Sequence, residues 1–305
     1  MKVFLIIAVA FSFVFGFEYT LKPVKVTEDV YCFFGKLETI SKKNAGNMVN
    51  SCFVQTKEGF VVIDSGPTYN YASQAYTQMQ NIAKLPVKYV INTHIHDDHW
   101  LGNSFFKSKG ALLIGPRTYE QNVVAGMQTR IGTILGKELF AQTTIVKLDT
   151  VIDNNLTIKV GEKSFQIKQL EPTAHTKGDL IIYSPERKVL FAGDLLFGGR
   201  LTSLRDGSLL GSIKALDKIE QYHAKYIIGG HGDNVTLEGE QAFKKYLLAL
   251  KEGVQKALDD DIGLEQVAKA VALPVYKEWK LYNELHRRNV VDAYRELEMM
   301  DEEDE

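Results

Sequence analysis

Short apolar runs alternate along the chain with segments whose apolar residues recur at helical spacing. The runs are rich in β-branched and aromatic residues and are bounded by turn-forming residues, which is typical of strands. We predict strands at residues 29–34, 50–56, 59–63, 87–92, 111–114, 156–160, 164–170, 180–184, 189–192 and 226–228. We predict helices at residues 71–84, from 102 onward, at about 118–139, at 212–222 and throughout the region after 237.

The order of these elements indicates the fold class. Strands and helices alternate in two successive groups, which predicts an α/β protein with layered sheets and helices on the outside. Neither a long linker nor a change in composition separates the groups, so we assign residues 17–258 to one domain. Residues 259–305 form a C-terminal helical extension that ends in an acidic tail. Its amphipathic spacing favours packing onto the domain; docking of a partner or covering of the active site is the alternative.

Residues 1–16 have the pattern of a signal peptide. A positive start is followed by an apolar run at 3–15, which is shorter than the stretch of about 20 residues that spans a bilayer. Val14 and Gly16 place permissive residues before a cut at Phe17. We therefore expect export to the periplasm or the medium, without stable membrane insertion after processing. An uncleaved N-terminal anchor is the alternative.

Composition narrows the possible partners. The chain has 305 residues, of which 45% are hydrophobic and 24% charged, as in an ordinary globular protein. Its 36 Lys and Arg against 38 Asp and Glu give a net charge of −2, which disfavours nucleic-acid binding because that needs a basic excess. Glycine-rich nucleotide-binding motifs are also absent from the sequence. A small-molecule substrate is the expected partner, and the sequence leaves the oligomeric state open.

The two cysteines lie in predicted strands that a polar loop connects. Cys32 and Cys52 can face each other across this hairpin. In an oxidising compartment such a pair forms a disulfide, whereas two buried thiols are the equally weighted alternative.

Residues that commonly bind metals gather at the ends of the predicted strands. They are His94, His96, Asp98 and His99, directly after the strand at 87–92, and His175, Asp194 and His231 after or beside later strands. Imidazole and carboxylate are ligands that zinc prefers. A single loop histidine is usually solvated, but three imidazoles and a carboxylate at a buried strand end are costly without compensation. The cluster therefore predicts a metal site.

The spacing assigns the ligands to two sites. Residues two apart in an extended turn point the same way, so His94 and His96 share one ion, completed by His175. Asp98 and His99 project toward a second ion, completed by His231, and Asp194 is placed to bridge the two. We expect two Zn²⁺ ions per chain, with iron or manganese as alternatives. Such a pair generates hydroxide at neutral pH for attack on a carbonyl carbon.

Other residues near these motifs are candidates for catalysis and substrate binding. Asp98 is the catalytic candidate, because it can assist proton transfer while it binds metal. Arg200, Arg205 and Lys177 can bind a substrate carboxylate, although exposed surface charge is the simpler interpretation of all three. Trp100 lines either the pocket or the core.

These motifs resemble the metallo-β-lactamase superfamily. The stretch His94-Ile-His-Asp-Asp-His99 resembles the family signature His-x-His-x-Asp-His, and Asp64, His175, Asp194 and His231 occur in the family's order. The resemblance covers residues 31–240 and implies a four-layer αβ/βα sandwich with the metals at one edge. It also implies that Asp64 is not a ligand but orients the metal-binding loop.

The residue at position 194 distinguishes branches of that family. True metallo-β-lactamases usually carry Cys or Ser there, and an Asp resembles the glyoxalase II, lactonase and SoxH-like branches, in which it bridges the metals. The resemblance thus implies an exported binuclear zinc hydrolase that acts on an ester, thioester, lactone or amide carbonyl. A true β-lactamase and a non-catalytic metal-binding accessory protein are the alternatives.

Overall fold

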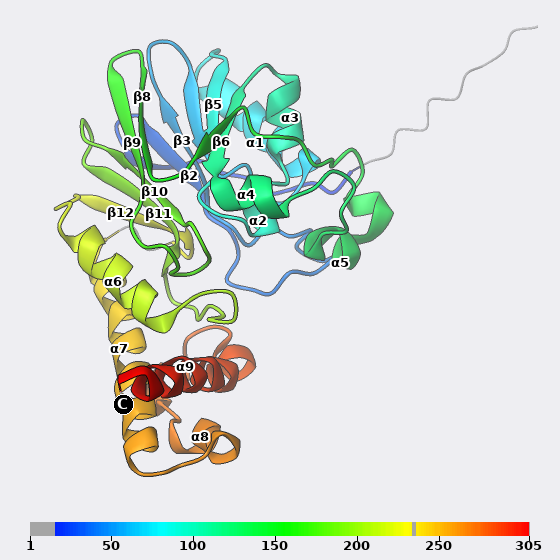
Figure 1. The fold of residues 1–305 in the computed structure, drawn as a ribbon. Helices are drawn as coiled ribbons and strands as arrows, with labels where there is room; N and C mark the ends of the chain where they lie inside the picture. The colour runs from blue at the N-terminus through cyan, green and yellow to red at the C-terminus, as the bar shows by residue number, and fades with distance from the viewer. Residues whose placement is uncertain (1–15, 234–235, 305) are drawn as a thin grey trace, which may run out of the picture.

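Two β-sheets face each other at the centre of the protein, with helices on their outer sides (Figure 1). The structure is a computed structural model that describes residues 16–233 and 236–304. In the described part of the chain, the first sheet has seven strands in sequence order: β1(Val24–Thr27), β2(Val30–Phe33), β3(Ser51–Gln55), β4(Phe60–Ile63), β5(Val87–Ile91), β6(Leu112–Pro116) and β7(Thr150–Ile152). The second, in the order β12-β11-β10-β9-β8, comprises β8(Asn155–Val160), β9(Lys163–Gln169), β10(Leu180–Ser184), β11(Val189–Phe197) and β12(Tyr226–His231).

Apolar side chains from both sheets fill the space between them. Val61 and Ile91 of the first sheet belong to the same buried cluster as Ile167, Ile182 and Phe191 of the second. Removal of this apolar surface from water holds the sheets face to face. Every residue of β11 is buried, as expected for a strand covered on both faces.

Helices cover the outer face of each sheet and complete four layers. On the first sheet, α1(Tyr69–Ile82) and α3(Asn103–Ser108) contribute buried residues to a cluster with β3, β4 and β5. On the second sheet, α6(Leu209–Glu220) and α7(Leu237–Asp259) pack against β11. The four-layer sandwich expected from the sequence is thereby confirmed.

The C-terminal helices pack onto the second half of the protein. They are α8(Leu264–Ala270), a 3-10 turn at Pro274–Tyr276, and α9(Tyr282–Asp304), and their apolar residues join the core of α6 and α7. Asn289 of α9 donates to Thr202 O and accepts from Leu204 N, while Glu296 accepts from Leu209 N. These bonds tie α9 to the loop that follows β11.

The helix predicted over 118–139 is wrong as one element. The structure has α4(Arg117–Asn122) and α5(Arg130–Leu139), separated by a loop that contains Gly126 at φ 78°. Thr129 caps α5 by accepting from Gly132 N, which starts a new helix rather than continuing the first. Gly136, at φ 74°, interrupts α5 again.

Smaller differences follow from local capping and from strand length. Ser208 caps α6, so that helix begins three residues before the predicted start at 212. The prediction missed β1 and β7, which are short strands at the two edges of the first sheet. It also missed the single turn α2(Asp97–Trp100), which is too short to show helical periodicity.

The structure tests the expected cysteine pair but not the expected signal peptide. Cys32 and Cys52 are register partners on β2 and β3, and a disulfide joins them, so the alternative of two buried thiols is wrong.

The proposed signal peptide lies almost entirely in residues 1–15, outside the described residues. Within the described chain, none of the helices combines the length and apolarity that crossing a membrane requires.

Candidate metal centre

The predicted metal ligands meet at one edge of the sandwich because of strand direction. β4 and β5 are parallel in the first sheet, and β11 and β12 are parallel in the second. Their carboxyl ends carry the segment at 92–99, Asp194 within β11, and His231 as the last residue of β12. Carboxyl ends of parallel strands share an edge, which is where open α/β sheets bind ligands.

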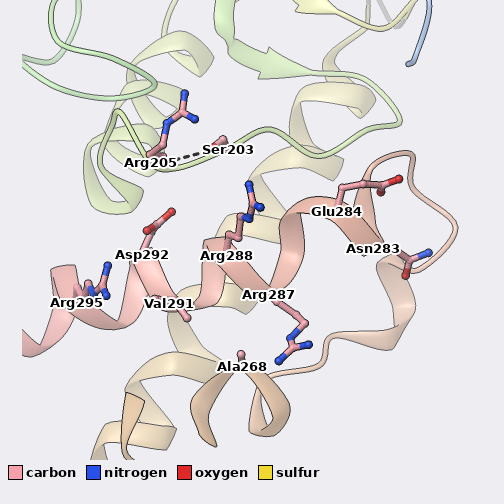
Figure 2. Close-up of a pocket in the computed structure, with 10 residues that line it drawn as sticks. All are labelled: Ser203, Arg205, Ala268, Asn283, Glu284, Arg287, Arg288, Val291, Asp292 and Arg295. Carbon is pink, nitrogen blue, oxygen red and sulfur yellow. Dashed lines mark hydrogen bonds between the residues drawn. The ribbon is translucent and has the colours of Figure 1, made fainter. Parts of the chain in front are cut away.

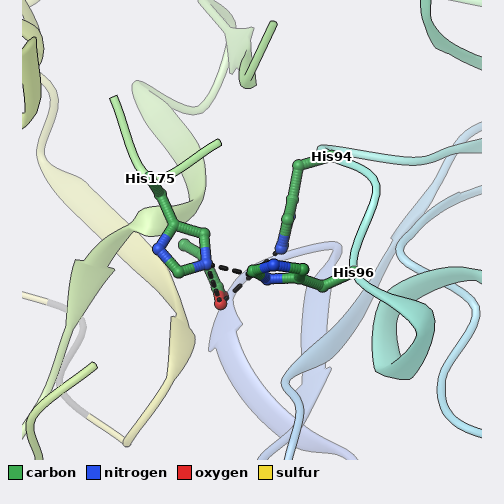
Figure 3. A group of neighbouring side chains, drawn as sticks. His94, His96 and His175 are labelled. Carbon is green, nitrogen blue, oxygen red and sulfur yellow. Dashed lines mark hydrogen bonds and ion pairs between the residues drawn. The ribbon is translucent and has the colours of Figure 1, made fainter. Parts of the chain in front are cut away.

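All seven predicted ligands lie there in two groups. The first group is His94, His96, His175 and Asp194, and the second is Asp98, His99 and His231. In each group the possible ligand atoms lie within 4.8 Å of one another. Figure 3 shows the imidazoles of His94, His96 and His175 turned toward a common point. This division reproduces the spacing argument made from the sequence.

The carboxylate of Asp194 lies between the two groups. Its Oδ2 is 3.2 Å from His175 Nε2 and 3.4 Å from His231 Nε2, and its Oδ1 is 3.2 Å from His99 Nε2. A Cβ at residue 230 would overlap Oδ1, so only glycine at that position lets the β12 backbone approach so closely. The surrounding imidazoles hold the pKa of Asp194 well below its usual range, against the effect of burial.

Hydrogen bonds on the side away from the ligand groups determine which ring nitrogen of His231 and of His99 faces the site. His231 Nδ1 lies 2.6 Å from Met48 O, and a carbonyl oxygen only accepts, so Nδ1 carries the proton. His99 Nδ1 likewise faces Asp64 Oδ2 at 2.8 Å. In both rings Nε2 is the nitrogen that faces the site. Such outer partners orient metal-binding imidazoles.

Asp64 organises this layer, as the resemblance implied. Its carboxylate accepts from Thr93 N and from Thr93 Oγ1, each at 2.8 Å, as well as from His99. Since the Thr93 hydroxyl donates to Asp64, its oxygen accepts from His94 Nδ1, 3.0 Å away. Asp64 therefore does not face the metal groups but fixes two of their imidazoles.

Arg130 holds Asp98 in place. Its Nη2 lies 2.8 Å from Asp98 Oδ1, while Asp98 Oδ2 faces His231 Nε2 at 3.4 Å. Burial alone would raise the pKa of Asp98, but the charge of Arg130 and the adjacent imidazoles holds it well below the usual range. Asp98 is thus ionised, with one oxygen anchored and the other directed into the site.

The unpartnered atoms of the site fit a metal ion. His94 Nε2, His99 Nε2 and Asp194 Oδ1 are buried and have no hydrogen-bond partner among the described residues. Leaving such groups unsatisfied costs about 1–3 kcal/mol each. Although burial lowers the pKa of His99, the carboxylates of Asp194, Asp64 and Asp98 raise it well above its usual value. The site therefore attracts positive charge, and its imidazole and carboxylate donors suit zinc.

The other candidates from the sequence have different surroundings. Arg200 is buried at 7% exposure and lines the metal pocket, so the exposed-surface interpretation is wrong for this residue. It is buried because residues 199–201 pair with Lys280 beneath α9, an arrangement that the local sequence does not reveal. Arg205 and Lys177 are exposed. Trp100 is buried, donates to Ile95 O and lines a neighbouring recess.

Comparison with known proteins decides the family. Residues 45–231 match the Metallo-beta-lactamase superfamily. The chain belongs to this superfamily. The relatives whose names state an activity are hydrolases, and this chain is a superfamily hydrolase with a His/Asp metal-binding cluster.

The superfamily relatives differ in their reactions. A "Metallo-beta-lactamase type 2" of Elizabethkingia meningoseptica is 26% identical over 201 residues, which are 60% of this chain and 69% of the relative. A "Linear primary-alkylsulfatase" of Pseudomonas sp. is 21% identical over 68% of this chain, which spans only 46% of that relative. A "Hydroxyacylglutathione hydrolase" of Synechococcus sp. is 28% identical over 58% of this chain and 66% of its own length.

Solved structures support the superfamily fold. A metallo-beta-lactamase from Pontibacter korlensis superposes with a TM-score of 0.60 at 22% identity, covering 75% of this chain and 99% of that chain. At this identity the likeness shows the fold alone.

Proposed function

We propose that this protein is an exported hydrolase that holds two zinc ions and cleaves an ester, thioester, lactone or amide carbonyl. The position of the Asp194 carboxylate between two groups of possible ligands carries this proposal. His94, His96 and His175 are assigned to one ion, and Asp98, His99 and His231 to the other. Asp194 is assigned to both.

The reaction needs a nucleophile at neutral pH and a general acid–base that transfers protons. When bound, the two zinc ions supply Lewis acidity and lower the pKa of coordinated water to about 7. Asp98 is assigned to proton transfer, because Arg130 fixes its Oδ1 while Oδ2 is directed into the site. Asp64 and Thr93 keep the rings of His99 and His94 in one orientation. Asp64, Thr93 and both of these rings are buried.

A true β-lactamase is the second candidate. The relative of Elizabethkingia meningoseptica and the structural neighbour from Pontibacter korlensis both carry that name. Asp194 opposes this candidate, because true metallo-β-lactamases usually have Cys or Ser at that position. A non-catalytic accessory protein is the third candidate.

One activity panel separates these candidates. The zinc-loaded chain without residues 1–16 is tested on an aryl ester, a thioester, a lactone, a sulfate ester and a chromogenic β-lactam, with and without a chelator. We expect chelator-sensitive turnover of at least one carbonyl ester, thioester or lactone, restored by zinc. Turnover of the β-lactam alone favours the second candidate, and full zinc content without any turnover favours the third.

Export is a separate part of the proposal. It is supported by the apolar run at 3–15 and by the permissive residues before Phe17. Mass analysis of the mature protein is expected to give an N-terminus at Phe17. An intact Met1 on membrane-bound protein would overturn this part without affecting the hydrolase proposal.

A further inference from the structure

We propose that the C-terminal extension positions two ligands of the first metal group. It does so through residues 198–208 between β11 and α6, which we call the β11–α6 loop. The extension thereby sets the zinc affinity of the first group and leaves that of the second group unchanged. This inference rests on the proposed function, because it concerns the same metal centre. It is carried by contacts of Lys280, Asn289 and Glu296.

The extension holds the β11–α6 loop at its start and in its middle. At the start, the backbone of Lys280 pairs with residues 199–201 in the manner of a parallel strand. In the middle, Asn289 of α9 donates to Thr202 O at 2.8 Å and accepts from Leu204 N at 3.2 Å. Figure 2 shows the loop running alongside α9. The path of the loop is therefore set by the extension over most of its length.

Glu296 of α9 holds the end of the loop, where α6 begins. Its carboxylate accepts from Ser208 Oγ at 2.5 Å, from Leu209 N at 2.6 Å and from Leu210 N at 3.2 Å. The first N–H groups of a helix have no partner within that helix, and a negative charge is favourable beside them. One side chain of α9 thus fixes the point at which the loop ends and α6 starts.

This end of the loop carries Asp206, which orients His96 of the first group. Asp206 accepts from His96 Nε2, and Nδ1 of the same ring faces His175 in the ligand group. His96 is the one member of its group that is not fully buried, so packing alone does not fix its ring. Because Asp206 lies two residues before Ser208, its carboxylate is placed by the bonds that Glu296 makes.

The same end of the loop holds the backbone beside His175. Ser208 N donates to Ala174 O at 2.7 Å. A Cβ at Gly207 would overlap the carbonyl oxygens of Ala174 and His175, so only glycine lets the loop pass this close. Two ligands of the first group, from separate segments of the chain, therefore depend on residues 206–208.

The second group takes its orienting partners from the first half of the chain. They are Met48 for His231, Asp64 for His99 and Arg130 for Asp98. Arg200 of the β11–α6 loop lies beside His231, but it is at the opposite end of the loop from the contacts of Glu296. A change at Glu296 is therefore expected to affect the first group alone, whereas a general loss of folding would affect both groups.

Separate zinc affinities of the two groups test this inference. His231→Ala leaves the first group complete, and His175→Ala leaves the second group complete. In the His231→Ala background, Glu296→Ala is expected to weaken zinc binding about tenfold, the low end of the usual effect of losing an orienting partner. In the His175→Ala background it is expected to leave zinc binding unchanged. Competition with a chromogenic chelator gives both affinities.

Further variants on α9 separate positioning from general stability. Glu298→Ala removes an exposed carboxylate from the same helix and should change neither affinity. Glu296→Gln keeps an oxygen that accepts from Leu209 N, and its amide can donate to Ser208 Oγ. It should therefore recover most of the affinity that Glu296→Ala loses. Asn289→Ala releases the middle of the loop and is expected to weaken the first group selectively as well.

These measurements use no substrate, so they are independent of turnover. If an ester is hydrolysed but neither Glu296→Ala nor Asn289→Ala changes the affinity of the first group, the inference is overturned and the hydrolase proposal stands. If no ester reacts but both variants weaken the first group alone, the inference stands and the hydrolase proposal fails. Equal weakening of both groups by both variants overturns the inference, because a general loss of folding gives that result.

Discussion

Asp206 accepts a hydrogen bond from His96, with 3.2 Å between its Oδ2 and Nε2 of the ring. The bond leaves Nδ1 of His96 unprotonated and facing the first group of ligands, where it lies 2.9 Å from His175 Nε2. The hydrogen bonds from His96 and Arg205 hold the pKa of Asp206 well below its usual range. A residue on the loop after β11 therefore orients a ligand supplied by the other sheet.

Asp206→Asn tests this orienting role. An amide can offer its NH₂ instead of an acceptor and no longer fixes the ring of His96, so zinc affinity at the first group is expected to fall about 10–100-fold. Competition with a chromogenic chelator measures the affinity. Asp153→Asn, an exposed carboxylate that also pairs with an arginine, is the control. Equal zinc affinity in Asp206→Asn and the wild type would show that the hydrogen bond does not orient a ligand.

Asp194→Asn removes the negative charge between the two groups while it preserves size and shape. We expect loss of at least one metal ion and a fall in hydrolysis of about a hundredfold or more. Asp194→Cys should retain partial metal binding, because thiolate is a good zinc ligand. Metal content by elemental analysis and kcat on the best ester are the measurements. Full metal content and full activity in Asp194→Asn would mean that this carboxylate does not bridge.

Glu240 makes stability depend on pH. The side chain is buried near the start of α7, and neither of its oxygens has a hydrogen-bond partner among the described residues. Burial, with the nearby charge of Glu220, raises the pKa of Glu240 to about 7. The folded protein therefore holds a proton that the unfolded chain has released between pH 4.5 and 7, so the stability contributed by this group falls as pH rises through that range.

Glu240→Gln measures that effect. The variant keeps the shape but cannot ionise, so it is expected to be more stable than the wild type at pH 8 by roughly 2–3 kcal/mol and nearly equal to it at pH 4.5. Urea unfolding of both proteins at several pH values gives the difference in the free energy of unfolding. A difference that does not change with pH would contradict the assignment.

The disulfide Cys32–Cys52 closes the loop that carries Met48 and Asn50. Met48 accepts from His231, and Asn50 donates to the carbonyls of Gly229 and Gly232 on either side of it. Closing a loop of this length stabilises a protein by about 3 kcal/mol in the chain-entropy account. Reduction is expected to lower the free energy of unfolding by about this amount, measured by urea unfolding with and without a reductant. The Cys32→Ala, Cys52→Ala double variant is the control and should not respond to the reductant.

The ligands could be predicted from the sequence because strand ends and short spacings determine them locally. His94 and His96 follow β5 directly, and alternation in an extended segment puts both rings on one side. The residues that hydrogen-bond to the ligands and orient them could not be predicted in the same way. Asp206, Met48 and Arg130 lie far from their partners along the chain, and only the packing of the two sheets brings them together.

The break between α4 and α5 and the burial of Arg200 were missed for related reasons. The apolar residues at 118–139 recur at helical spacing, and this spacing alone favoured one continuous helix. Gly126, with its positive φ, and Thr129, which caps α5, interrupt that helix. From the local sequence, Arg200 is expected to be an exposed charge on a loop. In the structure, the backbone at Lys280, just before α9, pairs with this loop and covers it. A tertiary contact made by the C-terminal extension thus turned a surface residue into part of the pocket.

The metal content of the purified protein tests the central claim most directly. The chain without residues 1–16, prepared without chelator and supplied with zinc, is measured by elemental analysis against protein concentration. Seven possible ligands in two groups joined by Asp194 predict two zinc equivalents per chain. A content that stays at one equivalent in excess zinc would contradict the two-ion site.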